Sequence, residues 1–228
     1  MAIRVVFHGH SNLEIFSGEH TIQLDPFYNN NPLADVKADA VSPDFVLLTH
    51  AHFDHVDDVA TVARKRNATV VANFEVAQHF EKQGLKTVGM NTGGGMDFPF
   101  GRATLTFAIH SSTFPDGANG GLPGGWIIQT GGKTIYHAGD TALFGDMALI
   151  GKLWKIDLAC LPIGDCFTMG PDHAVLAAEM LKPRRVLPIH YNTFPQIRQD
   201  AAEFVRKLKD KTGIEGLALL PGESFNVL

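Results

Sequence analysis

The sequence predicts an α/β fold in which two β-rich halves pack within one domain. Runs typical of strands alternate with runs typical of helices along the 228 residues. Continuous apolar runs at residues 45–49 and 158–163 indicate strands that are buried on both faces. The hairpin-like segment 15–22 resembles segment 128–135, although coincidence between two short hairpins also explains this likeness. Because no linker divides the chain, we predict a single domain over residues 1–228.

In the first half, each expected element follows from a local residue pattern. Apolar residues recur at helical spacing after residue 57, which predicts a helix there. Asn73 can cap the next helix, and Gly84 can end it. In chain order we expect strands at 3–7, 13–16 and 21–24, the buried strand at 45–49, a helix at 57–66, a strand at 68–72 and a helix at 74–83.

The second half begins with a strand and a loop over residues 111–125, which holds too much glycine and proline for regular structure. Its composition permits the mobility that a lid over a pocket needs. Gly213 stops the last expected helix. In chain order we expect a strand at 104–109, a hairpin of strands at 126–129 and 133–137, a buried strand at 158–163, a helix at 171–181, a strand at 185–189, a helix at 196–211 and a closing strand at 217–220.

Composition argues against several classes of protein. The net charge of −5 and the pI near 6.1 do not favour a nucleic-acid partner. No apolar run approaches the roughly 18 residues that a membrane span needs, and the first residues lack the features of a secretory signal. Two cysteines imply no disulfide framework and fit a reducing compartment. We therefore expect a cytoplasmic protein with a small-molecule substrate and no membrane partner, while the oligomeric state, a homo-oligomer included, stays open.

A cluster of potential metal ligands directly follows the first buried strand. His50, His52, Asp54 and His55 lie within six residues. Alternate residues of an extended segment point the same way, so His50 and His52 can chelate one ion, and Asp54 and His55 can face a second. Imidazole and carboxylate together suit zinc, manganese, iron or nickel rather than calcium. The lack of cysteine ligands argues against a closed structural zinc site.

Three further candidates each follow a strand-like run: His110, Asp140 and His190. Strand ends that meet loops are where functional sites are usually built. We therefore expect these three side chains to join the cluster at residues 50–55. A single histidine of this kind is more often structural than a ligand, and the expectation depends on the whole set.

This set of residues resembles the metallo-β-lactamase superfamily, with His-x-His-x-Asp-His at 50–55, a distant histidine, an aspartate in Gly-Asp-Thr at 139–141 and another histidine. The segments 9–11, 25–27, 167–171 and 190–195 are similar to those of small, largely uncharacterised metal-dependent hydrolases in that superfamily. Those proteins are similar in turn to ascorbate-phosphate lactonases, which use manganese. The resemblance implies a four-layer αββα sandwich over nearly the whole chain.

The resemblance also implies roles for individual residues. Two divalent metal ions are expected, zinc or manganese, with iron or nickel as alternatives. His10 is a further site candidate, Asp25 is a candidate to orient a ligand imidazole, and Asn192 can orient substrate or bond within its loop. By the resemblance His50, His52 and His110 hold one ion, Asp54, His55 and His190 hold the other, and Asp140 bridges the two.

The expected activity is that of a metal-dependent hydrolase acting on a small ester, lactone or phosphoester. A metal-bridging hydroxide would attack the substrate, with Asp54 and Asp140 as the catalytic carboxylates. His52 stands where redox members of the superfamily tend to carry an acidic residue, which favours hydrolysis. Asp165 and Cys166 depart from the residues common in such loops, so substrate contacts there stay open. The alternatives are a phosphodiesterase or nuclease on the same dinuclear core, and a non-catalytic metal-binding protein.

Overall fold

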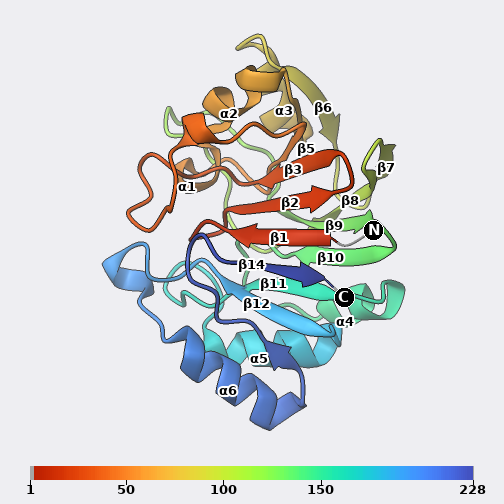
Figure 1. Cartoon of the computed structure of the whole chain (residues 1–228), viewed down its shortest axis with the longest axis vertical. Helices are drawn as coiled ribbons and strands as arrows, with labels where there is room; N and C mark the ends of the chain where they lie inside the picture. The colour runs from red at the N-terminus through yellow and green to blue at the C-terminus, as the bar shows by residue number, and fades with distance from the viewer. Residues whose placement is uncertain (1–2, 228) are drawn as a thin grey trace.

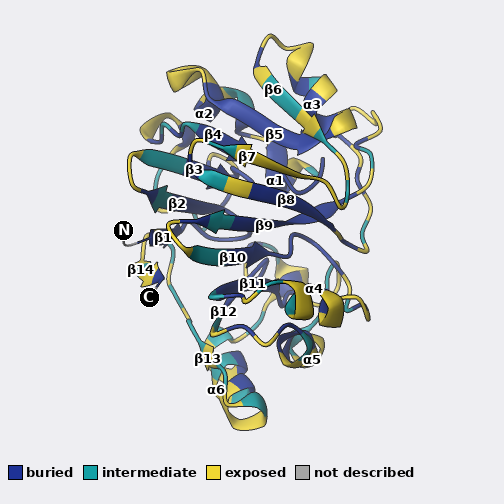
Figure 2. Ribbon diagram, turned by 90° about the vertical axis from the view of Figure 1, so that its right-hand side faces the viewer, coloured by how far each residue is buried: buried dark blue, intermediate teal, exposed yellow. Residues whose placement is uncertain are grey.

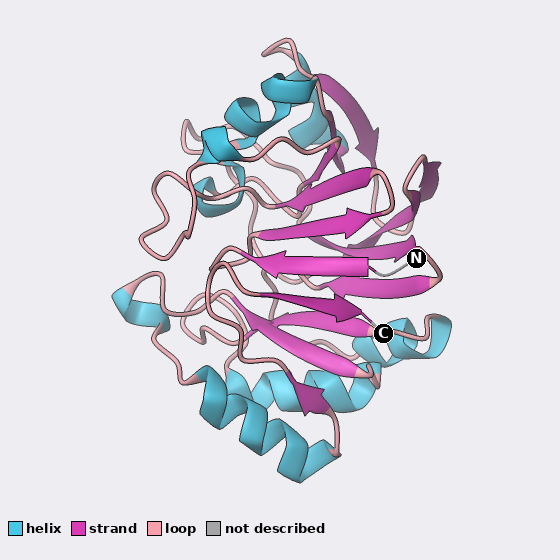
Figure 3. Cartoon of the chain, in the orientation of Figure 1, coloured by secondary structure: helices cyan, strands magenta, loops and turns pink. Residues whose placement is uncertain are grey.

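Two mixed β-sheets lie face to face, and helices cover their outer sides. The computed structural model describes residues 3–227, so the predicted domain of 1–228 includes three residues outside the described range. Figures 1 and 3 show the helices gathered on two opposite sides of the strands. Figure 2 shows that the strands are mostly buried, whereas the outer helices expose one face. This arrangement is the αββα sandwich that was expected.

Each sheet has seven strands within the described residues. The first sheet has the order β14 (Ser224–Val227), β1 (Ile3–Phe7), β2 (Leu13–Ser17), β3 (His20–Leu24), β4 (Phe45–Leu47), β5 (Thr69–Asn73) and β6 (Lys86–Met90). The second has the order β13 (Glu215–Gly216), β12 (Arg185–Ile189), β11 (Leu158–Pro162), β10 (Lys133–His137), β9 (Gly124–Thr130), β8 (Gly101–Phe107) and β7 (Gly95–Phe98).

The two sheets repeat one pattern of strand direction. Strands β1 to β3 are antiparallel, and β3 to β6 are parallel. In the second sheet β8 to β10 are antiparallel, and β10 to β13 are parallel. The similar segments 15–22 and 128–135 are therefore the equivalent hairpins β2–β3 and β9–β10. Their likeness reflects equivalent places in the fold.

The buried strand β4 shows how this sandwich is held together. Phe45 and Leu47 pack into the core between the sheets, whereas Val46 and Leu48 pack against the helices outside. Because both faces of the strand are covered, its sequence is continuously apolar. The fully buried Trp126 of β9 donates its indole N–H to the Leu48 carbonyl, 3.0 Å away, and so links the second sheet to the first. This link fixes the end of β4 that leads into the histidine cluster.

Two of the helices begin later in the chain than expected. The helix expected at 57–66 is α2, which begins only at Val59, and the short helix α1 before it was not expected; between the two helices, Asp58 accepts the backbone N–H groups of Tyr28 and Asn29. The helix expected at 196–211 begins only at Ala201, where Asp200 caps it. The helices are α1 (Phe53–Val56), α2 (Val59–Arg66), α3 (Phe74–Glu81), α4 (Met147–Leu153), α5 (Pro171–Leu181) and α6 (Ala201–Thr212), with 3-10 turns η1 (Ala38–Ala40) and η2 (Pro195–Ile197).

The prediction of a strand at 217–220 is wrong. That segment has no regular structure; Leu217 and Leu219 pack against the core, and Leu220 is exposed. The closing strands are instead β13, which pairs with β12 over two residues, and β14, which pairs with β1. In the part of the chain that the structure describes, no helix has the length and apolar character to cross a membrane.

Candidate metal centre

The seven predicted ligands come from segments that follow the ends of four strands. His50, His52, Asp54 and His55 lie beyond β4, on the turn into α1 and within it. The loops after β8, β10 and β12 supply the other three candidates. Parallel strands present their carboxyl ends at one edge of a sheet, which is why segments far apart in sequence meet here. The convergence expected for His110, Asp140 and His190 is therefore present in the structure.

Three imidazoles form the first group, the three-histidine cluster of His50, His52 and His110. His52 Nδ1 lies 2.9 Å from His50 Nε2 and 3.2 Å from His110 Nε2. Zinc–nitrogen bonds of ~2.0–2.1 Å at tetrahedral angles separate neighbouring nitrogens by about 3.3 Å. The spacing of these three nitrogens is close to that of ligands around one ion.

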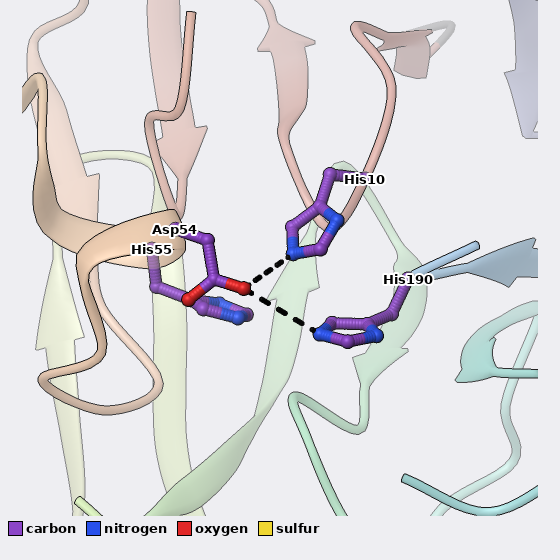
Figure 4. Close-up of side chains that lie close together, drawn as sticks. All are labelled: His10, Asp54, His55 and His190. Atoms are coloured by element: carbon purple, nitrogen blue, oxygen red, sulfur yellow. Dashed lines mark hydrogen bonds and ion pairs between the residues drawn. The ribbon is translucent and has the colours of Figure 1, made fainter. Parts of the chain in front are cut away.

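The second group, the Asp54 cluster, consists of His10, Asp54, His55 and His190 (Figure 4). Asp54 Oδ2 lies 3.0 Å from His10 Nε2 and 3.7 Å from His190 Nε2. His10 is fully buried, and its Nδ1 lies 2.8 Å from the Thr193 hydroxyl. The structure therefore brings His10 to the site. Thr193 had no distinguishing sequence signal, because it lies 183 residues from His10 along the chain.

Asp140 lies between the two groups. Its Oδ2 is 2.9 Å from His190 Nε2 and 3.3 Å from His55 Nε2. The same oxygen is 3.6 Å from His110 Nε2 and 3.9 Å from His50 Nε2. One carboxylate oxygen thus faces four imidazole nitrogens from both clusters, which is the placement of a bridging ligand.

Asp25 holds two of these imidazoles in one tautomer. Its Oδ2 accepts the Nδ1–H of His55 at 2.8 Å and the hydroxyl of Thr49 at 2.7 Å. Since the Thr49 proton is directed to Asp25, the Thr49 oxygen accepts from His50 Nδ1, 3.0 Å away. The Nε2 lone pairs of both histidines are left to face the centre of the site. This supports the orienting role expected of Asp25, which is the usual role of a carboxylate behind a ligand histidine.

A divalent cation fits this arrangement of donors. His55 Nε2 and Asp140 Oδ1 are buried and have no hydrogen-bond partner. The fixed tautomer of His55 aims a lone pair at a carboxylate oxygen, an arrangement that only a proton or a cation makes favourable. Imidazole with carboxylate is a donor set for zinc, manganese, iron or nickel.

The charges of the site also favour a cation. Burial, together with neighbouring imidazoles, lowers the pKa of every member of the three-histidine cluster, which keeps their lone pairs free. Although burial alone raises a carboxyl pKa, His190 and His55 hold the pKa of Asp140 well below its usual range. Burial opposes charge on His190 as well, yet Asp140 raises its pKa to about 9. Without a metal, Asp140 is therefore an ionised carboxylate beside His55 and His190, and it raises the pKa of both imidazoles. A bound cation can replace the protons that these two imidazoles hold.

Backbone strain is concentrated at the same place. His10, Asp25 and His190 have φ values of 58°, 41° and 54°. The left-handed region costs a non-glycine residue on the order of 1 kcal/mol or more, and such residues gather at functional sites. The backbone N–H of His190 donates to the His10 carbonyl at 2.9 Å, so two of the strained residues hold each other in place.

A cavity of about 640 Å³ opens onto the two clusters. Asn192 lies outside it, because its side-chain oxygen accepts the backbone N–H of Gln199 at 2.8 Å and the residue borders a separate hollow. The loop-bonding alternative for Asn192 is thus the one that the structure supports. Beyond the candidate ligands, the cavity is lined by Phe53, Ser111, Cys166, Phe167, Phe194, Pro195 and Gln196.

The loop over residues 111–125 is anchored on both sides. The Ser112 hydroxyl accepts the Ala51 backbone N–H at 3.2 Å near the start of the loop, and the Asn73 amide donates to the carbonyls of Gly120 and Leu122 near its end. Of this loop only Ser111 lines the cavity, where its hydroxyl lies 3.2 Å from His52 Nε2. These contacts argue for a fixed border, so a lid movement stays a prediction.

Comparison with known proteins agrees with the fold and the donor set, which are those of a metallo-hydrolase. Residues 20–191 match the family model described as Beta-lactamase superfamily domain. A UPF0173 metal-dependent hydrolase of Thermus thermophilus is 50% identical over 221 residues, which cover 97% of each chain. One from an Exiguobacterium strain is 45% identical over 99% of this chain and 100% of its own.

Solved structures agree with these relatives. The metallo hydrolase Igni18 from the archaeon Ignicoccus hospitalis is 35% identical, with a TM-score of 0.91 over 99% of this chain and 98% of that one. The chain belongs to the metallo-β-lactamase superfamily and, within it, to the UPF0173 family of metal-dependent hydrolases. The fold and the class of enzyme predicted from the sequence are thereby confirmed.

Proposed function

We propose that this metal-dependent hydrolase holds two divalent ions and cleaves a small ester, lactone or phosphoester. The observation that carries the proposal is the position of Asp140, whose Oδ2 lies within 3.9 Å of imidazole nitrogens from both clusters. The first ion would be held by His50, His52 and His110, the second by Asp54, His55 and His190, and Asp140 would be shared.

The protein's own groups explain how the reaction would be organised. Bound divalent ions lower the pKa of water toward neutrality and polarise the substrate oxygen. Asp54 lines the cavity and can accept a hydrogen bond from the attacking water, while His10 orients its Oδ2. Asp25, through His55 and Thr49, keeps the imidazoles in the tautomer that leaves Nε2 free.

The donor set supports zinc or manganese, with iron or nickel as alternatives. The cavity volume of about 640 Å³ suits a small molecule. We therefore propose a small-molecule substrate and no nucleic-acid partner. A nuclease or phosphodiesterase on the same centre has no observation in its favour, because the lining contains no lysine or arginine. A purely metal-binding role does not fit a chain whose relatives are hydrolases.

Metal analysis combined with a substrate panel tests this proposal. We expect about two ions per chain, and turnover of an ester, lactone or phosphoester that a chelator removes. His52→Ala should lower the metal content and reduce turnover roughly a thousandfold or more, because it removes one of three nitrogens around an ion. The control His173→Ala changes an exposed histidine of α5 and should alter neither quantity. Full activity of metal-replete His52→Ala would refute the ligand assignment.

A further inference from the structure

We propose that the cavity selects an uncharged ester or lactone that carries an aromatic or branched alkyl group, and that it disfavours phosphoesters and other anionic substrates. This inference rests on the proposed hydrolytic function and narrows its substrate class. Two independent features of the cavity support it: the apolar walls beside the candidate ligands, and the absence of lysine and arginine among the described residues that line it.

Phenylalanine rings form much of the wall. Phe53 and Phe167 are 46% and 51% exposed, although both line a concave cavity, and Phe194 is partly exposed beside them. Large apolar side chains that stay open to solvent within a pocket indicate surface that a ligand covers. A purely polar substrate would leave these rings in contact with water.

The rings are positioned by the same elements that position the ligands. Phe53 is the first residue of α1, between His52 and Asp54, so its ring lies beside the metal centre. Phe27 supports it from one side with a centroid distance of 5.8 Å, and Phe194 lies 6.0 Å from it. An apolar group attached to the reacting carbonyl would meet this wall directly.

Apart from the candidate ligand histidines, the polar part of the lining is neutral or acidic. Asp54 and Asp140 are its only carboxylates, and Ser111, Cys166 and Gln196 are uncharged polar groups. Arg198 borders the separate hollow beside Asn192 and Asp200. Protein sites that bind a phosphate or carboxylate away from a metal use arginine or lysine. An anionic group beyond the reacting atoms would find no such partner here.

Four substrates with one leaving group test this selection: p-nitrophenyl acetate, p-nitrophenyl phenylacetate, the p-nitrophenyl monoester of succinate, and p-nitrophenyl phosphate. We expect kcat/KM for the phenylacetate to exceed each of the others by about tenfold or more, because its ring is buried against the wall. A phosphate or succinate ester cleaved as well as the phenylacetate, in a chelator-sensitive reaction, would overturn the inference and leave the hydrolase proposal intact.

Two substitutions and a control locate the effect in the cavity. Phe167→Ala should lower the ratio of phenylacetate to acetate kcat/KM about tenfold. Phe74→Ala removes a ring of α3 that is 52% exposed and lies outside the cavity, and it should leave the ratio unchanged. Gln196→Arg adds a cation to the lining and should raise kcat/KM for the succinate monoester several-fold relative to kcat/KM for the acetate. An unchanged ratio in Phe167→Ala would contradict the role of the wall.

A binding measurement separates this inference from catalysis. Cys166 is exposed in the cavity, whereas Cys160 is buried and burial raises the pKa of its thiol, so iodoacetamide should label Cys166 selectively. On metal-loaded protein, phenylacetamide should slow this labelling and acetamide should not. Equal effects of the two amides would overturn the inference. Protection by phenylacetamide without chelator-sensitive turnover of any substrate would support the apolar pocket and refute the hydrolytic function.

Discussion

In the first half of the molecule the loop after the buried strand β4 carries four candidate ligands. In the second half the equivalent loop, after β11, carries none of the predicted ligands and contributes Cys166 and Phe167 to the cavity wall. The strands that lead into the two loops have the same neighbours and directions. The two equivalent loops thus differ in what they bring to the cavity: candidate metal ligands come from the loop after β4, and part of the apolar wall comes from the loop after β11.

The supports of the two loops are alike in detail. Asp44 begins the segment of β4, and its carboxylate accepts the Thr21 backbone N–H at 2.9 Å. Asp157 begins the segment of β11, and its carboxylate accepts the Thr134 backbone N–H at 3.0 Å. The two halves therefore share this arrangement of strands, and they differ in the loops that follow the strands. Loops tolerate insertion and substitution, so functional residues can differ there at little cost to the fold.

We expect the largest difference in turnover between variants of Asp140 and Asp25, the two aspartates that follow the equivalent hairpins β9–β10 and β2–β3. Asp140 faces the imidazoles directly, so Asp140→Ala should reduce turnover roughly a thousandfold or more. Asp25 acts through His55 and Thr49, and Asp25→Ala should cost about 10–100-fold in metal affinity or activity. Metal titration and steady-state kinetics on both variants give this comparison. Equal losses would mean that Asp25 is also a ligand, and the two halves would then contribute alike.

A smaller effect should appear at Asn73, the last residue of β5. Its side chain caps α3 through the Val76 N–H and also donates to the carbonyls of Gly120 and Leu122. Asn73→Ala should lower the free energy of unfolding by about 2–3 kcal/mol, measured by denaturant titration. Asp200→Ala removes only the cap of α6 and should cost about 1 kcal/mol. Identical losses would show that anchoring the loop over residues 111–125 adds no stability.

The smallest expected loss of stability tests whether the aspartates that begin the β4 and β11 segments support the two halves equally. Asp44→Ala and Asp157→Ala each remove a partly buried acceptor of one backbone N–H. They also remove ion pairs that solvent weakens, one to Arg66 from Asp44 and two to Lys133 and Arg184 from Asp157, so each substitution should cost about 1 kcal/mol. Turnover should persist in both variants, because neither residue reaches the cavity. A loss of several kcal/mol in one variant alone would mean that one half carries more of the stability.

The convergence of the candidate ligands was predictable from the sequence because each group of them lies just beyond the end of a predicted strand. His190 directly follows β12, Asp140 follows β10 after Ala138 and Gly139, and the strand before His50 is apolar on both faces. Contacts that depend on long-range packing had no such signal. Thr193 meets His10 only in the folded chain, and Phe53 forms a cavity wall through its place beside the ligands.

Local sequence patterns also gave wrong predictions of secondary structure where tertiary contacts determine the conformation. Asp58 was predicted to lie within a helix, but it lies just before α2, where its carboxylate accepts the backbone N–H groups of Tyr28 and Asn29. The apolar run 217–220 packs without pairing as a strand. The strands β6 and β7 lie at sheet edges, where exposed residues and glycine blur the alternation that marks a strand.

The hydrogen bond from His190 to the His10 carbonyl has a consequence for biosynthesis. The ribosome releases residues 50–55 before His110, Asp140 and His190, so a nascent chain first presents only two of the candidate ligands of each proposed ion. On the proposed assignment, the Asp54 cluster is complete only once the segment after β12 has docked beside His10, so metal binding there depends on the assembly of both halves of the chain.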